Sequence, residues 1–251
     1  MTMELNTFIN NYREAFGDAV ELPVAFWYSD TPIADTEKLN GCFFKEIKNT
    51  GEGKPLSLSL DVIGCGGGKF YTGFTEMPER IPNFVSLKEK YKQTPEMIID
   101  FIEKLEVPRA EKPYLNFYRI DKIDSFENIE GLLFFATPDV LSGLTAWAFF
   151  DNNSEDAVTS LFGSGCSAVV TQAVVENRKN GRKTFVGFFD ISMRPYIEAN
   201  ILSFVIPLSR FKEMYHTIRN TCLFDTHAWQ KIRNRINENH ESGTAHKKID
   251  I

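Results

Sequence analysis

Several features that commonly reveal a protein's role are missing from this chain of 251 residues. It has no run of about 18 consecutive apolar residues, the length that a membrane-spanning helix requires. Its first eleven residues lack the basic start and apolar run of a secretory signal. Lys and Arg number 28 against 34 Asp and Glu, so no basic face for nucleic acid is expected. We therefore expect a cytoplasmic protein that binds neither a membrane nor nucleic acid.

Common motifs for metal, nucleotide and catalytic sites are incomplete. No two of the four cysteines have the CxxC spacing of a zinc or thioredoxin site. The segment Gly64-Cys-Gly-Gly-Gly68 resembles a phosphate loop, but Lys69 is followed by Phe70 where Ser or Thr is needed. A dinucleotide loop would need glycine at position 69. The four histidines all lie late in the chain, between His216 and His246. These patterns do not support nucleotide binding.

Hydrophobic and charged residues make up 43% and 25% of the chain, which is typical of a globular protein. Apolar residues recur at helical spacing after position 5, after Thr94-Pro95 and after Pro138. Apolar or alternating runs predict strands at residues 24–28, 56–62, 114–120, 131–136, 184–189 and 202–206. Strands follow one another and also alternate with helices. This mixture favours an α+β fold with a mixed sheet and packed helices.

We expect one domain over residues 1–237, or two closely packed halves at about 1–125 and 126–237. Residues 238–251 form a polar tail that we expect to be disordered, and dispensable from Glu241 onward. A weak internal repeat is a further hypothesis, because an apolar strand precedes a glycine-flanked cysteine in each half. The oligomeric state stays open, and a homo-oligomer is one option.

Three cysteines form the first candidate site. Cys65 lies among glycines after a predicted strand, and Cys166 follows Gly163-Ser-Gly165 at the start of a predicted helix. Such glycines allow close approach to the backbone, so we expect Cys65 and Cys166 to meet at one edge of the fold with Cys42 near them. Together they would ligate an iron–sulfur cluster or another soft metal. Each could instead be a small buried hydrophobic residue, which is the role expected for Cys222.

Two other uses of these segments are open. Backbone amides and polar groups at Gly66, Gly67, Gly165 and Ser167 would bind a small anionic molecule, helped by Asp190 and Arg194. The last two residues would either pair locally or leave Arg194 free to bind a ligand carboxylate or phosphate. Cys166 would alternatively be the nucleophile of a thiol enzyme, although no histidine partner is evident.

Taken together, these segments resemble a prokaryotic family, domain of unknown function 169. The resemblance extends over about residues 23–207 and leaves 76–127 and the end beyond Met214 unmatched. It rests on Cys42, Cys65 with its glycines, and the segments 71–74, 133–138, 163–167, 190–194 and 202–207. The resemblance implies that the three cysteines belong to one pattern, but it implies no activity. We therefore expect binding of a small, anionic molecule first, a soft-metal redox site second and thiol catalysis third.

Overall fold

The computed structural model describes residues 2–161 and 163–241. Seven strands form one sheet: β1 (Val24–Ser29), β2 (Leu56–Leu58), β3 (Tyr114–Arg119), β4 (Gly131–Ala136), β5 (Val158–Thr159), β6 (Thr184–Gly187) and β7 (Leu202–Pro207). Their order across the sheet is β2-β3-β1-β4-β7-β6-β5. All neighbours are antiparallel except β5 and β6. Since β1 pairs with β4, both halves of the chain contribute to the same sheet. The expected α+β class is confirmed.

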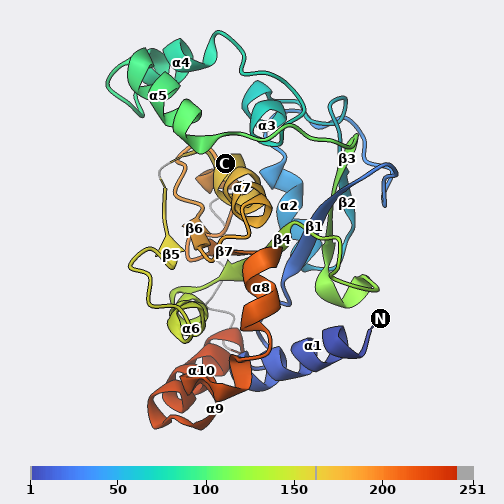
Figure 1. Ribbon diagram of the computed structural model, residues 1–251, viewed down its shortest axis with the longest axis vertical. Coiled ribbons are helices and arrows are strands. Elements are labelled where there is room, and N and C mark those ends of the chain that lie inside the picture. Colours follow the sequence, from blue (N-terminus) through green and yellow to red (C-terminus); the bar gives the residue numbers. More distant parts are fainter. Residues whose placement is uncertain (1, 162, 242–251) are drawn as a thin grey trace.

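Helices cover both sides of this sheet, above and below it in Figure 1. The longer ones are α1 (Met3–Phe16), α2 (Phe44–Gly51), α5 (Pro95–Leu105), α6 (Pro138–Phe149), α7 (Gln172–Arg178), α8 (Leu208–Met214) and α10 (His227–Glu241). Short ones are α3 (Gly66–Tyr71), α4 (Ile81–Asn83) and α9 (Cys222–Asp225). Two wide π-helical turns, η1 (Phe84–Lys88) and η3 (Ser167–Thr171), and the 3₁₀ turns η2 (Ile120–Lys122), η4 (Arg194–Tyr196) and η5 (Ile218–Asn220) complete the set. Within the described residues, no helix combines the length and apolar character needed to cross a membrane.

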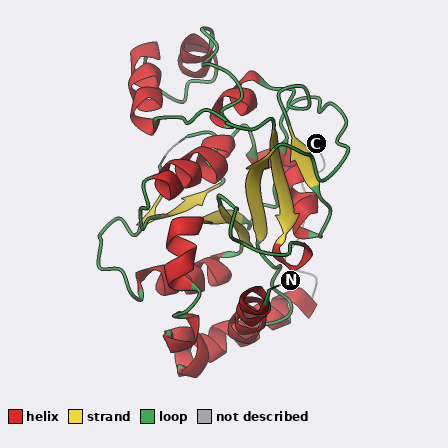
Figure 2. Ribbon diagram, turned by 45° about the vertical axis from the view of Figure 1, so that its right-hand side comes forward, coloured by secondary structure: helices red, strands yellow, loops and turns green. Residues whose placement is uncertain are grey.

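The alternation of side chains along each strand divides the core into two clusters. Val24, Phe26 and Leu133 point to the side covered by α2, α3, α5 and α7, which we call the α7 face. Ala25 and Leu132 point to the opposite side, covered by α1, α6, α8 and α10, which we call the α1 face. Because both sides are covered, β1 and β4 are nearly continuous apolar runs, as sequence analysis predicted. Figure 2 shows the strands with helices on either side.

The structure corrects several boundaries. The strand expected at 56–62 ends at Leu58, because Ser59 Oγ accepts a hydrogen bond from the Val62 amide and turns the chain. Leu60 is consequently 43% exposed. Of the polar tail expected at 238–251, residues 238–241 continue helix α10, and 242–251 lie outside the described residues. Cys222 was expected in the core, but it is exposed at the start of α9.

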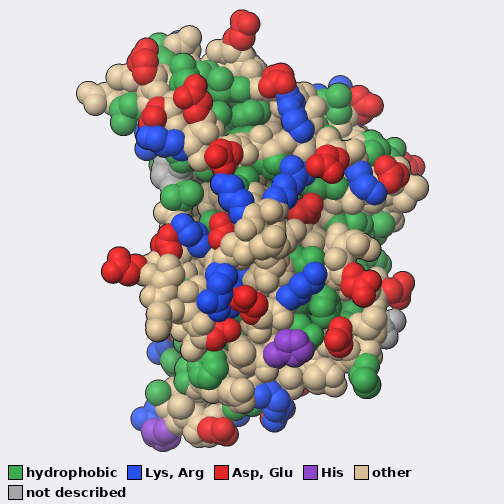
Figure 3. All heavy atoms as spheres, viewed as in Figure 1, with side chains coloured by type: hydrophobic (Ala, Val, Ile, Leu, Met, Phe, Trp, Pro, Cys, Tyr) green, Lys and Arg blue, Asp and Glu red, His purple; other side chains and the backbone are tan. Residues whose placement is uncertain are grey.

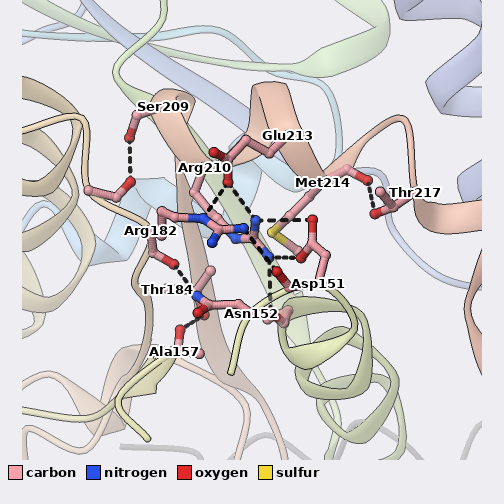
Figure 4. Close-up of polar contacts among 12 residues, drawn as sticks. Asp151, Asn152, Ala157, Arg182, Thr184, Ser209, Arg210, Glu213, Met214 and Thr217 are labelled. Atoms are coloured by element: carbon pink, nitrogen blue, oxygen red, sulfur yellow. Dashed lines mark hydrogen bonds and ion pairs between the residues drawn. The ribbon is translucent and has the colours of Figure 1, made fainter. Parts of the chain in front are cut away.

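A buried polar cluster holds the junction of α6 and α8 (Figure 4). Arg210 on α8 is fully buried. Its guanidinium bonds the Asp151 carboxylate, Glu213 Oε2 at 2.7 Å and the Ala148 carbonyl at 3.0 Å. Arg182, just before β6, reaches the same Glu213 at 2.7 Å. A buried guanidinium needs such partners, so this cluster fixes the end of α6 against α8.

Candidate functional site

Segments far apart in the sequence meet around one cavity of about 330 Å³ on the α7 face. Cys42 before α2, Cys65 before α3 and Cys166 before η3 all line it. Asp190, in the loop after β6, lines it too. The structure thus places the three cysteines of the predicted pattern around a common space.

The Cys65 segment is fixed against the chain just before Cys42. The Leu39 amide donates to the Val62 carbonyl at 2.8 Å. A Cβ on Gly64 would lie 2.1 Å from the Leu39 carbonyl oxygen, so only glycine allows the two segments to come this close. The Gly68 amide donates to Cys65 Sγ at 3.1 Å and starts α3. The glycines around Cys65 predicted that another group would approach the backbone closely. At Gly64 that group is the backbone of Leu39, within the same chain, and not a ligand.

Gly66 and Gly67 differ from Gly64 because they border open space. A Cβ on Gly67 would meet no atom within 4 Å. A Cβ on Gly66 would meet only Pro78 at 3.5 Å and Arg80 Nη2 at 3.7 Å. These two predicted ligand-binding residues therefore face the cavity with room for another molecule.

The second glycine segment is already occupied by a carboxylate. Asp190 is 8% exposed, and its Oδ2 accepts a hydrogen bond from the Gly165 amide at 3.2 Å. Its Oδ1 accepts bonds from the amide and hydroxyl of Ser192 at 2.9 and 2.8 Å. Ser167 is fully buried and does not line the cavity. An external anion at Gly165 would have to displace Asp190, so the structure does not support the expected anion site there.

One wide helical turn lines the cavity, and a second begins just behind its wall. The turn η3 directly follows Cys166, and the Thr171 hydroxyl donates to the Tyr71 carbonyl at 2.6 Å, which joins it to α3. The turn η1 contributes Phe84 and Val85 to the cavity wall. Such π-helical turns insert a residue into a helix and occur frequently at functional sites. Of the wide turns in the described chain, η1 thus lines the cavity, and η3 begins directly after Cys166 in its wall.

The cavity roof comes from residues 74–109, which we call the helical excursion. Its ends meet where the Ala110 amide donates to the Gly73 carbonyl at 3.0 Å. It contributes Arg80, Phe84 and Phe101 to the cavity wall. Hydrophobic side chains also gather on its outer surface, over α4 and α5 at the top of Figure 3. The helical spacing after Pro95 predicts the apolar side of α5 but not the surface that it covers, because no motif marks a contact between such distant segments.

The comparison with protein families gives one match, to residues 19–217. The chain belongs to the DUF169 family. The family is described only as an uncharacterised ArCR, and that description carries no activity. The match includes the helical excursion, which the sequence resemblance left unmatched. No curated protein and no solved structure matches the chain.

Two of the cavity thiols of this DUF169 member, those of Cys42 and Cys166, are held in their neutral form. Burial, with smaller effects of Cys65 and Asp190, raises the pKa of Cys42 to about 11. Burial and the neighbouring Cys42, Cys65 and Asp190 raise the pKa of Cys166 well above its ordinary value. A nucleophilic thiolate needs the opposite shift. No histidine among the described residues lines the cavity, so Cys166 lacks the base that a thiol enzyme would use.

The expected soft-metal centre is not assembled. In the described part of the chain, no three or more His, Cys, Asp or Glu side chains are grouped so that they could hold a metal ion. The three cysteines share a cavity, but they do not form a ready set of metal ligands. The iron–sulfur hypothesis gains no support from this geometry.

Arg194 does not reach the cavity. Its guanidinium donates to the carbonyl oxygens of Ile201 at 2.6 Å, Ala199 at 2.7 Å and Glu198 at 3.0 Å. It is not among the residues that line the cavity, and its side chain does not pair with Asp190. The cation that sequence analysis sought at this site is provided instead by Arg80.

A second, larger cleft of about 550 Å³ lies beside α6 and α10. Four of the charged groups at this cleft are paired: Lys48 with Glu198, and Asp139 with Arg235. None of the cysteines and neither glycine segment borders it. We therefore take the cysteine-lined cavity as the candidate site, although it is the smaller one.

Proposed function

We propose that the chain binds a small organic carboxylate in the cysteine-lined cavity. The observation that supports this most directly is Arg80. Its guanidinium lies beside the open Gly66 and lines the cavity, yet it forms no hydrogen bond or ion pair within the described part of the chain. A planar guanidinium is suited to bidentate recognition of a carboxylate.

The balance of charge around the cavity favours an anion at Arg80. The other charged side chains of the wall are Lys92, Asp190 and Glu89, and burial together with the neighbouring Asp190 raises the pKa of Glu89, which disfavours its charged form. Lys92 lies over the Phe101 ring, 5.8 Å from its centroid. The Asp190 carboxylate is satisfied by N–H and O–H donors. Arg80 is therefore the cation of the cavity wall that a ligand can pair with.

The remaining wall requires an apolar body in the ligand. Ile81, Phe84, Ile98, Phe101 and Tyr71 present carbon to the cavity. The neutral thiols of Cys42 and Cys166 add weakly polar surface rather than charge. A volume near 330 Å³ is at the lower end for small-molecule sites, so the ligand is a compact monocarboxylate with an aliphatic or aromatic body.

A binding screen tests this proposal. The probes are aliphatic and aromatic monocarboxylates of graded size, each paired with its neutral amide. We expect some carboxylates, and none of the matched amides, to raise the melting temperature and to give a measurable Kd by calorimetry. Loss of a charge-assisted hydrogen bond costs about 1.5–3 kcal/mol, so Arg80→Gln should weaken binding roughly 10- to 100-fold.

The matched control is Arg13→Gln. Arg13 is a surface arginine on α1, on the opposite face, and its side chain pairs with the exposed Asp18. This variant should bind like the wild type. Equal binding by Arg80→Gln and wild type, or equal binding of acids and amides, would overturn the proposal, as would a screen with no binder.

We also propose a cytoplasmic location. All four cysteines are free thiols, the state that the reducing cytoplasm maintains. Exposed Cys222 makes the argument stronger, because a surface thiol is the one that an oxidising compartment would modify first. Fractionation of cells that express the chain, followed by thiol labelling before lysis, tests the location. Recovery of the chain in an oxidised extracellular fraction would contradict it.

A further inference from the structure

We infer that Cys42 and Cys65 form a peroxide-oxidisable pair that closes a disulfide within the cavity. The formation of the disulfide depends only on the two cysteines. Its effect on ligand binding rests on the function proposed above.

The backbone brings the two residues together. The segments before Cys42 and before Cys65 run side by side, joined by the 2.8 Å hydrogen bond from the Leu39 amide to the Val62 carbonyl. A Cβ on Gly64 would lie 3.0 Å from the Gly41 nitrogen, so the residues immediately before the two cysteines are in contact. Cys65 also contributes to the raised pKa of Cys42, so the two side chains are neighbours as well as the two backbones.

The two thiols are also more accessible than the third. Cys42 and Cys65 are partly exposed, whereas Cys166 is buried at 6% exposure. Both line the same cavity, so a small peroxide that enters it meets both sulfur atoms. The Gly68 amide donates to Cys65 Sγ at 3.1 Å, whereas burial raises the pKa of Cys42 to about 11 and makes Cys42 the poorer nucleophile. Cys65 is therefore the sulfur that reacts first, and Cys42 resolves it.

The chemistry balances with a hydroperoxide as oxidant. The Cys65 sulfur attacks one peroxide oxygen, the O–O bond breaks, and Cys65 sulfenic acid and water form when the peroxide is hydrogen peroxide. The Cys42 thiol then attacks the sulfenic sulfur, the S–O bond breaks, and the disulfide and a second water form. Two thiols lose two electrons and two protons, and the peroxide accepts them. A thiol reductant reverses the step.

Closure of this disulfide should hinder ligand binding. Gly66 and Gly67 follow Cys65 directly and form the open part of the cavity wall. Drawing Cys65 toward Cys42 displaces these glycines relative to Arg80, which lies beside Gly66. The pair would thus link the redox state of the cavity to its occupancy.

Mass spectrometry of the full chain tests the pair without any ligand. The protein is treated with hydrogen peroxide, free thiols are alkylated under denaturing conditions, and cross-linked peptides are mapped before and after reduction. We expect a reducible peptide that joins Cys42 to Cys65. In Cys42→Ser, Cys65 should instead accumulate as a sulfenic acid that dimedone labels, while the control Cys222→Ser should retain the wild-type disulfide. A disulfide that involves Cys166 or Cys222 in the wild type, or unmodified Cys42 and Cys65, would overturn the inference.

The effect on the ligand is measured separately. A carboxylate that binds the reduced protein should bind the oxidised protein at least tenfold more weakly, with recovery after reduction. Equal affinity of the two forms would overturn the link to occupancy but not the disulfide. If no carboxylate binds the reduced protein, the proposed function fails, and the peptide map still decides the cysteine pair.

Discussion

The two faces of the sheet differ in how their side chains fill space. On the α1 face, Phe8 stacks on Trp147 and meets Phe211 edge to face, and all three are fully buried. The indole nitrogens of Trp147 and Trp229 donate to backbone carbonyls at 2.9 and 2.7 Å, so these two buried polar atoms are satisfied. On the α7 face, glycines, wide helical turns and partly exposed thiols leave a cavity.

This contrast indicates that one face of the sheet mainly stabilises the fold and the other mainly forms the candidate binding site. Close packing with satisfied polar groups stabilises a fold, whereas a cavity costs stability in proportion to its volume. The α1 face and its junctions should therefore supply most of the stability. The α7 face is less closely packed, because it contains the cavity lined by the three cysteines, Asp190 and Arg80. Substitutions on the two faces should consequently separate stability from binding.

The largest loss of stability is expected from Asp151→Ala. This change leaves the fully buried Arg210 without its main carboxylate partner at the α6–α8 junction, the contact drawn in Figure 4. Breaking a buried ion pair in this way costs about 3–5 kcal/mol. Urea unfolding measures the effect, and binding of a cavity ligand to the remaining folded protein should not change. The control Asp18→Ala, which removes an exposed partner of Arg13, should cost less than about 0.5 kcal/mol. A loss below 1 kcal/mol for Asp151→Ala would contradict the role given to this cluster.

Two alanine substitutions within the α7 face should have opposite consequences. In Gly64→Ala, the new methyl would lie 2.1 Å from the Leu39 carbonyl oxygen, so the backbone must shift and stability should fall by about 2 kcal/mol. In Gly67→Ala, the methyl meets no atom within 4 Å, and replacing a helical glycine should leave stability unchanged or raise it by about 0.5 kcal/mol. Binding should weaken in Gly67→Ala, since its methyl enters the cavity. Equal stability of the two variants would show that the segments are not held as closely as described.

Much of the fold follows from local pattern, and the exceptions have local causes. The continuous apolar run of β4 predicted its strand to the residue. Helix α5 begins at Pro95, where the helical spacing predicted it, and Thr94 caps it by accepting from the Met97 amide. The strand from Leu56 was predicted too long because alternation continues past Leu58, while the Ser59 side chain turns the chain. The hydrogen bond from the Val62 amide to the Ser59 side chain thus ends the strand, although the alternation of apolar and polar residues continues.

The site was less predictable because its contacts join distant segments. Glycines beside Cys65 and Cys166 indicated a close approach, but they did not say that Gly64 meets Leu39 or that Asp190 meets Gly165. Arg194 lies four residues from Asp190, and that spacing suggested a pair, whereas nearby carbonyls take its guanidinium. Arg80 belongs to no motif. Its place over the glycines depends on how residues 74–109 fold back, which spacing in the sequence does not record.

The smallest expected effect is a pH dependence that belongs to the α7 face alone. Burial raises the pKa of Cys42 from 9.0 to about 11 in the folded chain, so folding favours the neutral thiol. Its contribution to stability is therefore fully present below pH 9 and is lost as the pH rises from 9 through 11. A shift of this size corresponds to at most about 2.7 kcal/mol, and partial exposure of the thiol reduces the expected contribution to about 1 kcal/mol.

Urea unfolding at pH 8 and at pH 10.5, with a reductant present, measures this contribution. Tyrosines and lysines titrate in the same range, so the informative quantity is the difference between variants. Cys42→Ala removes the titrating thiol and should lose about 1 kcal/mol less than the wild type between the two pH values. Cys222→Ala removes an exposed thiol on the α1 face and should follow the wild type. Parallel losses in wild type and Cys42→Ala would mean that the folded α7 face does not hold this thiol in its neutral form. The cavity would then be better solvated than its apolar wall implies, and Arg80 would bind a carboxylate correspondingly more weakly.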